Sequence, residues 1–251
     1  MMETLELNGL SKIFNAPPDR EVVALKNVDL QIASGEFVAV IGPTGCGKTT
    51  LLRIIAGLEA PSCGAILLDG KPVIDLHRIS TLVFQQYSLF PWLDVLGNVA
   101  FPMEMKGIHK KERLKRAEEY IALVGLTAFE KAKPYELSGG MQQRVAIARA
   151  LAHDPEVLLM DEPFGALDER TRHRLQKILL QIWQEKRKTI LFVTHNIDEA
   201  IYLADRIIIM ATEPGRVVAQ QRVSLGRPRD RLAEKFTKIH LEIRNIIEQS
   251  A

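Results

Sequence analysis

The sequence is short of several features that mark whole classes of protein. Its 251 residues include two cysteines, Cys46 and Cys63, too few for a disulfide framework, so both are expected to be reduced thiols. Lys and Arg number 33 against 31 Asp and Glu, and this small excess excludes a sequence-independent electrostatic grip on nucleic acid. The longest apolar runs are strand-sized, such as 37–41, whereas a bilayer span needs about 20 residues.

A secretory signal is also absent from the first residues. Such a signal has basic residues followed by an apolar run, whereas the chain starts Met-Met-Glu-Thr-Leu-Glu, so a cytosolic protein is expected. With 47% apolar and 25% charged residues, the composition is that of an ordinary globular protein. At about one domain per 150 residues, the length predicts one large domain or a core with a subdomain.

Apolar periodicity predicts an α/β protein. The first forty residues alternate in polarity, which indicates strands with one exposed face. The continuous run 37–41 predicts a strand buried on both faces, followed by a helix from about Gly47 to Gly57. Two further apolar runs, 157–160 and 189–193, flank a charged helical stretch and predict a strand, a helix and a parallel strand.

A helical insertion interrupts this predicted core. Residues 110–124 have the periodicity of an amphipathic helix, and Pro214-Gly215 indicates the turn of a hairpin before a closing helix near 231–248. We therefore expect a single domain over 1–251, divided into a core, a helical subdomain, and a C-terminal hairpin and helix. The expected boundaries are 1–86 and 155–212 for the core, 87–154 for the helical subdomain, and 213–251 for the C-terminal part.

Glycines between the first buried strand and its helix form a phosphate-loop pattern. Two glycines five positions apart, Gly42 and Gly47, are followed by Lys48 and Thr49, and this order of strand, loop and helix leaves little weight for a plain glycine turn. Glycines let backbone N–H groups aim at phosphate oxygens, while Lys48 would reach the β and γ phosphates and Thr49 would bind Mg²⁺. The predicted nucleotide-binding residues here are Gly42, Pro43, Thr44, Gly45, Cys46, Gly47, Lys48, Thr49 and Thr50.

Polar residues end the two later buried strands. Asp161 and Glu162 follow one apolar run, where adjacent carboxylates are costly to bury without a cation or water. Asp161 would hold Mg²⁺, and Glu162 would take the proton from an attacking water. His195 ends the next strand and is expected along the same sheet edge as Glu162, although a lone histidine there is often structural. A solvated acidic turn is the alternative for the carboxylates.

A second loop with paired glycines opens a predicted helix. Leu-Ser-Gly-Gly-Met-Gln-Gln-Arg occupies 137–144, where Ser138 is a plausible N-cap and the glycines bare backbone N–H groups. This forms a second anion site that one nucleotide cannot share with the first loop. A simply capped helix is an equal alternative.

The order of these motifs resembles the ATPase subunits of ATP-binding-cassette transporters over nearly the whole chain. The resemblance implies a phosphate-loop (RecA-like) ATPase core with an N-terminal antiparallel β subdomain and an inserted α-helical subdomain. It also implies ATP and Mg²⁺ as ligands and a head-to-tail homodimer. In this dimer one subunit's signature residues would close over ATP held by its partner's phosphate loop; they are Ser138, Gly139, Gly140 and Gln142.

The resemblance assigns further roles residue by residue. Phe14 would stack on adenine, although an aromatic there could equally be core. Gln85 would touch Mg²⁺ and the attacking water, so the implied magnesium ligands are Thr49, Gln85 and Asp161, and the catalytic residues are Glu162, His195 and Gln85. Asp168 would cross the dimer interface, and His195 would contact the γ-phosphate.

A narrower resemblance concerns importers. Leu89-Phe-Pro-Trp-Leu-Asp-Val95, together with Arg227 and Arg229, is similar to the subgroup that imports nitrate, aliphatic sulfonates and taurine, although that subgroup often has proline at Gly226. A solvated basic turn is an equal alternative for the arginines. The implied partners are two membrane permease subunits and, indirectly, an extracytoplasmic binding protein, with no nucleic acid. The implied location is peripheral, at the cytoplasmic face of the cell membrane.

Three alternatives to this importer subunit stay open. One is a soluble cassette ATPase acting on DNA or ribosomes, which usually needs a long coiled coil or two cassettes per chain. Another is an inert nucleotide-binding scaffold, which the presence of Lys48, Asp161, Glu162 and His195 disfavours. The third is an importer subunit for another small solute. The aromatic cluster of Tyr87, Leu89, Phe90, Trp92 and Leu93 is expected to face a permease.

Overall fold

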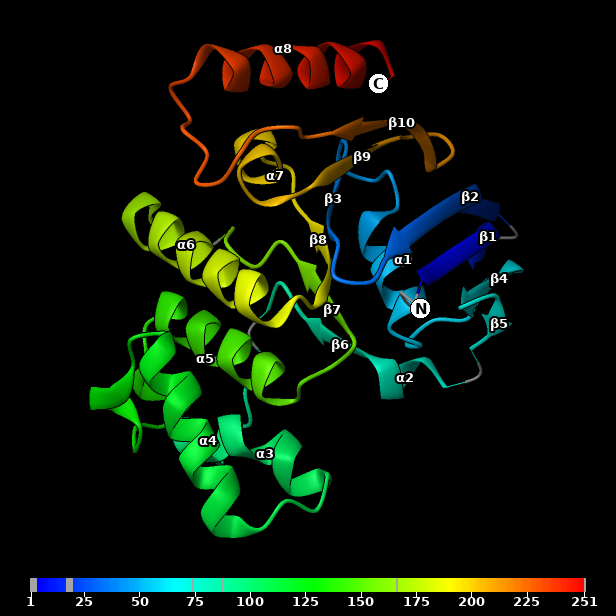
Figure 1. Ribbon diagram of the computed structural model, residues 1–251. Coiled ribbons are helices and arrows are strands. Elements are labelled where there is room, and N and C mark those ends of the chain that lie inside the picture. Colours follow the sequence, from blue (N-terminus) through cyan, green and yellow to red (C-terminus); the bar gives the residue numbers. More distant parts are fainter. Residues whose placement is uncertain (1–3, 17–19, 74, 87, 166, 251) are drawn as a thin grey trace. The chain divides into compact units, whose positions relative to one another are not determined.

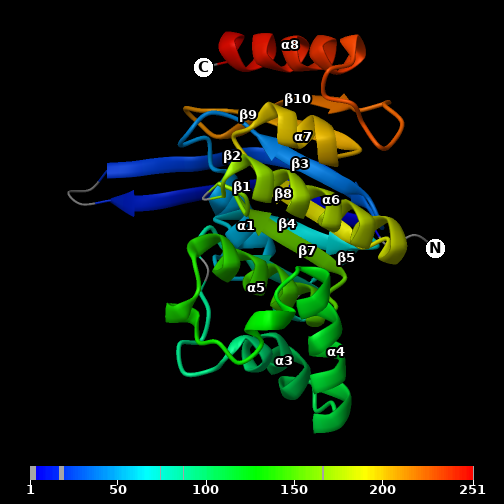
Figure 2. The same ribbon diagram turned by 90° about the vertical axis from the view of Figure 1, so that its left-hand side faces the viewer.

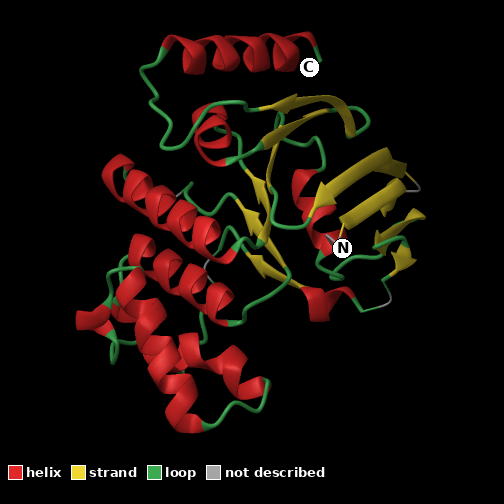
Figure 3. Ribbon diagram, viewed as in Figure 1, coloured by secondary structure: helices red, strands yellow, loops and turns green. Residues whose placement is uncertain are grey.

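The chain forms two compact units. The computed structural model describes residues 4–16, 20–73, 75–86, 88–165 and 167–250. One unit contains residues 1–80 and 187–251, and the other contains residues 81–186. Figure 1 labels the elements, and Figure 3 shows that both units mix helices with strands, which confirms the α/β class. The functional boundaries expected at 86, 154 and 212 remain a prediction.

The first unit begins with an antiparallel sheet in the strand order β2-β1-β4-β5. Its strands are β1 (Thr4–Ala16), β2 (Arg20–Ala33), β4 (Cys63–Leu68) and β5 (Lys71–Pro72). β1 and β2 pair into a long ribbon, seen in blue in Figure 2. Leu5 lies opposite Ile32 and Leu7 opposite Leu30, and all four are buried. The alternation predicted near the N-terminus thus places one apolar face of β1 and β2 inward.

A second sheet of this unit has the order β10-β9-β3-β8. Its strands are β3 (Phe37–Ile41), β8 (Thr189–Val193), β9 (Arg206–Ala211) and β10 (Arg216–Arg222). β3 is parallel to both neighbours, whereas β10 pairs antiparallel with β9 in the expected hairpin. Every residue of β3 and β8 is buried, which explains why both read as unbroken apolar runs.

The helices of the first unit complete its core. They are α1 (Lys48–Ile55), α2 (Leu76–Ile79), α7 (Ile197–Leu203) and α8 (Glu234–Gln249). α8 packs against α7 and β9 through its buried Phe236 and Ile243. None of the helices that the structure describes, in either unit, is both long and apolar enough to cross a membrane.

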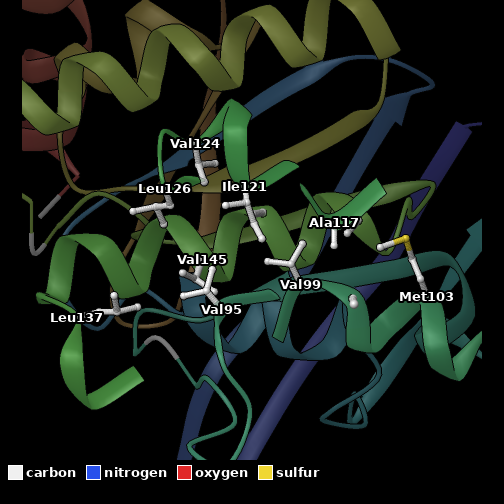
Figure 4. Packing of buried hydrophobic residues seen from close by; sticks show 12 residues of the cluster. Val95, Val99, Met103, Ala117, Ile121, Val124, Leu126, Leu137 and Val145 are labelled. Carbon is white, nitrogen blue, oxygen red and sulfur yellow. The ribbon is translucent and has the colours of Figure 1, made fainter. Parts of the chain in front are cut away.

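The second unit is built mainly of helices. Its elements are β6 (Ser80–Val83, with Ser80 in the first unit), α3 (Val95–Met105), α4 (Lys110–Leu123), α5 (Gly139–Ala152), β7 (Val157–Asp161), α6 (Glu169–Lys186), and 3₁₀ turns at Thr127–Phe129 and Pro134–Glu136. Val99 of α3, Ile121 of α4 and Val145 of α5 are each 0% exposed and meet in one cluster (Figure 4). The apolar stripe predicted for 110–124 therefore holds α4 against α3 and α5.

Candidate functional site

The predicted phosphate loop joins β3 to α1. Helix α1 begins at Lys48, and Gly47 at its N-cap has a φ of 90°. A Cβ at Gly47 would lie 2.6 Å from the Ala24 carbonyl oxygen, and a Cβ at Gly42 would lie 2.4 Å from that of Met210. Only glycine fits such close approaches of backbone to backbone. The loop is therefore wound tightly against its own unit, as a phosphate cradle requires.

The Lys48 ammonium lies inside this loop. Its Nζ donates to the carbonyl oxygens of Gly42 at 2.8 Å and Pro43 at 2.9 Å, and Lys48 is 8% exposed. Gly45, by contrast, faces open space, because a Cβ there would meet no atom within 4 Å. A buried cation beside the N-terminus of α1, with no acid in the helix's first turn, suits a phosphate group.

His195 follows a strand that neighbours the one leading into the phosphate loop. β8 pairs in parallel with β3, and Val193 lies opposite Val40. The Thr194 N–H extends this ladder by donating to the Val40 carbonyl at 3.2 Å. The loop and the exposed His195 thus follow the carboxyl ends of adjacent parallel strands. Ligands of open α/β sheets bind at this edge.

The predicted carboxylates lie in the second unit. Asp161 ends β7 and is 6% exposed, and the half-buried Glu162 follows with a φ of 45°. A positive φ is uncommon for a residue with a side chain, and the Gly165 N–H closes the turn by donating to the Glu162 carbonyl at 3.1 Å. Gln85 is exposed after β6, the strand next to β7. Joint action of these residues with His195, in the other unit, remains a prediction.

The donor set expected for Mg²⁺ consists of hard oxygen atoms. Thr49 would supply a hydroxyl, Asp161 a carboxylate and Gln85 an amide oxygen, which fits this ion. Within the described ranges, no group of three or more His, Cys, Asp or Glu could hold a metal ion. Mg²⁺ commonly takes only one or two protein carboxylates, together with water and substrate phosphates.

The second glycine motif caps α5 as the sequence predicts. Ser138 is its N-cap and is exposed, and its Oγ accepts from the Met141 N–H at 3.3 Å. Gly140 leaves little room for a side chain, since a Cβ would lie 3.1 Å from Leu167. Gln142 turns back, because its Nε2 donates to the Leu137 carbonyl at 3.2 Å and to a second carbonyl of the preceding turn. The amide of Gln142 is thus already engaged within its own unit.

Asp168 has a local role at the start of α6. Its Oδ1 accepts from the Thr171 N–H at 3.0 Å, and the bonds from Thr171 hold the pKa of Asp168 below its usual value. Burial and the nearby Arg174 lower the pKa of Arg144 on α5, while Asp168 opposes this shift. The role of Asp168 at a dimer interface remains a prediction.

Phe14 is exposed near the carboxyl end of β1. It lies opposite Val22 of β2, and both side chains are partly open to solvent, at 37% and 43%. The Lys12 ammonium lies 4.8 Å from the centre of the Phe14 ring. Phe14 is therefore not a core residue, and its stacking on adenine remains a prediction.

The aromatic segment after Gln85 divides between surface and core. Tyr87 lies outside the described residues, and Leu89 packs against the cluster of α3, α4 and α5. Trp92 is 69% exposed, and its ring stacks on Phe90 with the centroids 5.3 Å apart. The predicted surface is thus carried mainly by the exposed Trp92, with Phe90 and Leu93 half-buried beside it.

Two polar residues that sequence analysis missed fix this segment. Asn98, at 0% exposure, accepts from the Phe90 N–H at 2.9 Å and donates to the carbonyls of Phe90, Leu93 and Asp94. Lys133 Nζ donates to the Trp92 carbonyl at 2.9 Å. The signal for Asn98 was a lone amide inside an apolar helix.

The basic turn near the C-terminus is structural, which excludes the alternative of a solvated turn for Arg229. Arg229 is 6% exposed and donates to carbonyls at the end of α7, including Ala204 at 2.6 Å. Burial, with Arg227 nearby, lowers the pKa of Arg229 to about 10. Arg227 pairs with Asp205 at 2.6 Å. Both arginines therefore attach the segment after β10 to the end of α7 and the residues that follow it.

Comparison with known proteins identifies relatives along almost the whole chain. The sequence profile of the ABC transporter family matches residues 25–165. An uncharacterized ABC transporter ATP-binding protein of Methanocaldococcus jannaschii is 53% identical over 99% of this chain and 92% of its own length. The aliphatic sulfonates import ATP-binding protein SsuB of Bacillus cereus is 47% identical, covering 96% of this chain and 94% of that protein.

A taurine import protein and a solved structure extend these likenesses. The taurine import ATP-binding protein TauB of Roseobacter denitrificans is 47% identical over 88% of this chain and 83% of its own. A dimeric ATP-binding cassette, solved in a post-hydrolysis state with ADP and Pi, superposes with a TM-score of 0.81. It is 37% identical and covers 88% of this chain and all of the solved chain.

Proposed function

We propose, because this chain belongs to the ABC transporter family, that it is the ATP-hydrolysing, energy-coupling subunit of an importer for a small oxyanion such as nitrate, a sulfonate or taurine. The observation that carries the proposal is 47% identity with a sulfonate import subunit along 96% of the chain. The tight phosphate loop and the capped signature helix α5 supply what such a subunit needs.

Different residues of the chain bind ATP and catalyse its hydrolysis. Lys48 and the N-terminus of α1 hold the phosphates, and Phe14 stacks on the adenine. Glu162 takes the proton from the attacking water, and His195 contacts the γ-phosphate. Positioning and charge neutralisation supply most of the acceleration in phosphoryl transfer. Mg²⁺, held by Thr49, Asp161 and Gln85, would neutralise charge on the phosphates.

Two copies of the chain would complete the ATP sites head to tail. Ser138 is exposed at the N-terminus of α5. This helix end would form a second anion site, which suits phosphate held by a partner. The related cassette of known structure is dimeric. Closure of the dimer on ATP would then drive the permease, because the closed form binds ATP more tightly.

Mixing two inactive variants tests this arrangement. Ser138→Arg should block closure, because a bulky cation replaces a small cap, and Lys48→Ala should weaken ATP binding. At an ATP concentration near the wild-type Kd, each variant alone is expected to have little activity. An equimolar mixture should recover about a quarter of the intact composite sites, since half of randomly paired dimers are mixed and each holds one such site. Phosphate release and ATP-dependent sizing measure this; no recovery, or two equivalent sites per mixed dimer, would contradict head-to-tail pairing.

The Phe90 and Trp92 surface would receive the permease at the cytoplasmic face of the membrane. A large exposed aromatic side chain on a fixed loop suits the centre of an interface. An extracytoplasmic binding protein would deliver the solute to the permease without touching this chain.

Trp92→Ala is expected to reduce copurification with the permease and solute-stimulated ATPase at least about tenfold, as for a truncated interface hot spot. The melting temperature of the isolated subunit should stay unchanged, because the ring is 69% exposed. Met105→Ala, equally exposed at 69% on α3, serves as the matched control and should keep the complex. A complex that survives Trp92→Ala, or a subunit that unfolds, would remove Trp92 from the docking surface.

A further inference from the structure

The residues on both sides of His195 are joined by hydrogen bonds. Thr194 Oγ1 donates to Glu199 Oε2 at 2.7 Å, and the Asn196 N–H donates to the same Thr194 oxygen at 3.0 Å. Asn196 Oδ1 in turn accepts from the Glu199 N–H at 3.1 Å. These bonds close a ring between the end of β8 and the first turn of α7, and His195 lies between two of its members in the sequence. Figure 1 labels both elements.

Burial distinguishes this ring from an ordinary helix cap. Thr194 is 2% and Glu199 is 7% exposed, whereas the intervening His195 is exposed. Asn196 already caps α7 through its own side chain, and capping alone does not require a buried carboxylate bonded to a threonine hydroxyl. A buried carboxylate is tolerated only where bonds and dipoles stabilise it, and here the N-terminus of α7 adds to the bond from Thr194.

The ring is attached to rigid structure at both ends. The Thr194 N–H donates to the Val40 carbonyl of β3, the strand that leads into the phosphate loop. The carboxyl end of α7 is held by Arg229, whose guanidinium donates to the Ala204 carbonyl at 2.6 Å. The backbone at His195 is therefore fixed relative to the loop that carries Lys48, within one unit of the fold.

We propose that Thr194, Asn196 and Glu199 form a clamp that holds His195 in place for the γ-phosphate of ATP, which makes Thr194 and Glu199 positioning residues. This inference rests on the proposed function of His195. ATP is bound mainly by the phosphate loop, so loss of the clamp should affect kcat rather than KM. Freeing the backbone of one residue corresponds to a loss of about 5- to 30-fold in kcat.

The test is a double-mutant cycle on the intact chain. Thr194→Val removes the hydroxyl at nearly constant volume, Glu199→Ala removes its partner, and Thr194→Ser retains the bond. Steady-state ATPase should show kcat lowered about 5- to 30-fold in the first two, with KM for ATP within about twofold and activity retained in Thr194→Ser. In a His195→Ala background, neither change should lower kcat further, because the clamp acts through the histidine.

Thr189→Val is the matched control. Thr189 begins the same strand and its Oγ1 accepts a bond from the Gly35 N–H at 3.0 Å, so this variant should lose similar stability yet keep kcat. The melting temperature of every variant is measured. Thr194→Val and Glu199→Ala remove the same hydrogen bond from opposite ends, so one of them can be used if the other fails to fold. Wild-type kcat in the clamp variants, an equal loss in Thr189→Val, or a full further loss without His195 would overturn the clamp. Wild-type kcat in His195→Ala alone would instead overturn the role of the histidine on which it rests.

Discussion

A Glu162→Gln protein is expected to hydrolyse ATP about 10²- to 10⁴-fold more slowly than the wild type, because an amide cannot take the proton from the attacking water. The substitution keeps the size of the side chain and an oxygen that accepts hydrogen bonds. The backbone at this position already has a φ of 45°, which a glutamine tolerates as well as a glutamate does. ATP binding should therefore persist, and steady-state phosphate release at saturating Mg-ATP measures the loss.

The variant should also accumulate in the closed state. ATP that binds without being hydrolysed leaves the two subunits together, so sizing with Mg-ATP should show a dimer. Glu169→Gln is a matched control, since it makes the same change at an exposed position in the first turn of α6 and should keep wild-type turnover. Normal hydrolysis by Glu162→Gln would exclude Glu162 as the base, and an equal loss in both variants would point to destabilisation instead.

The parts of the site that depend on local sequence were predictable. The run 37–41, the glycines after it and the start of α1 follow from burial and backbone geometry within about ten residues. The cap of α5 by Ser138 is equally local, because a side chain bonds a backbone N–H three residues ahead. Each of these signals can be recognised within one short stretch of sequence, and the structure agrees with them.

Features that depend on tertiary packing were not predictable. Arg229 reads as part of a basic turn, and only the approach of the end of α7, more than twenty residues earlier, turns it into a donor to buried carbonyls. Glu199 looks like an ordinary acid in the first turn of a helix, and its burial against Thr194 follows from the packing of β8 and α7. The role of such buried polar residues is set by the partners that folding brings to them.

Lys48→Ala is expected to weaken ATP binding about 10- to 100-fold, because it removes one charge-assisted contact worth roughly 1.5–3 kcal/mol. In the structure the ammonium donates to the Gly42 and Pro43 carbonyls, so its position is set by the loop itself. Those bonds hold the cation where phosphate groups would approach the helix N-terminus. Equilibrium binding of ATP, by calorimetry or a fluorescent analogue, measures the effect.

Two further variants separate the effect of the Lys48 charge from the effects of overall net charge and of the aliphatic stem of Lys48. Lys71→Ala changes the net charge equally at an exposed site in β5 and should bind ATP as the wild type does. Lys48→Met keeps most of the aliphatic stem, so it should preserve packing while losing affinity nearly as far as Lys48→Ala. If Lys48→Met binds ATP normally, the stem rather than the ammonium holds the loop, and the phosphates must be neutralised by other groups.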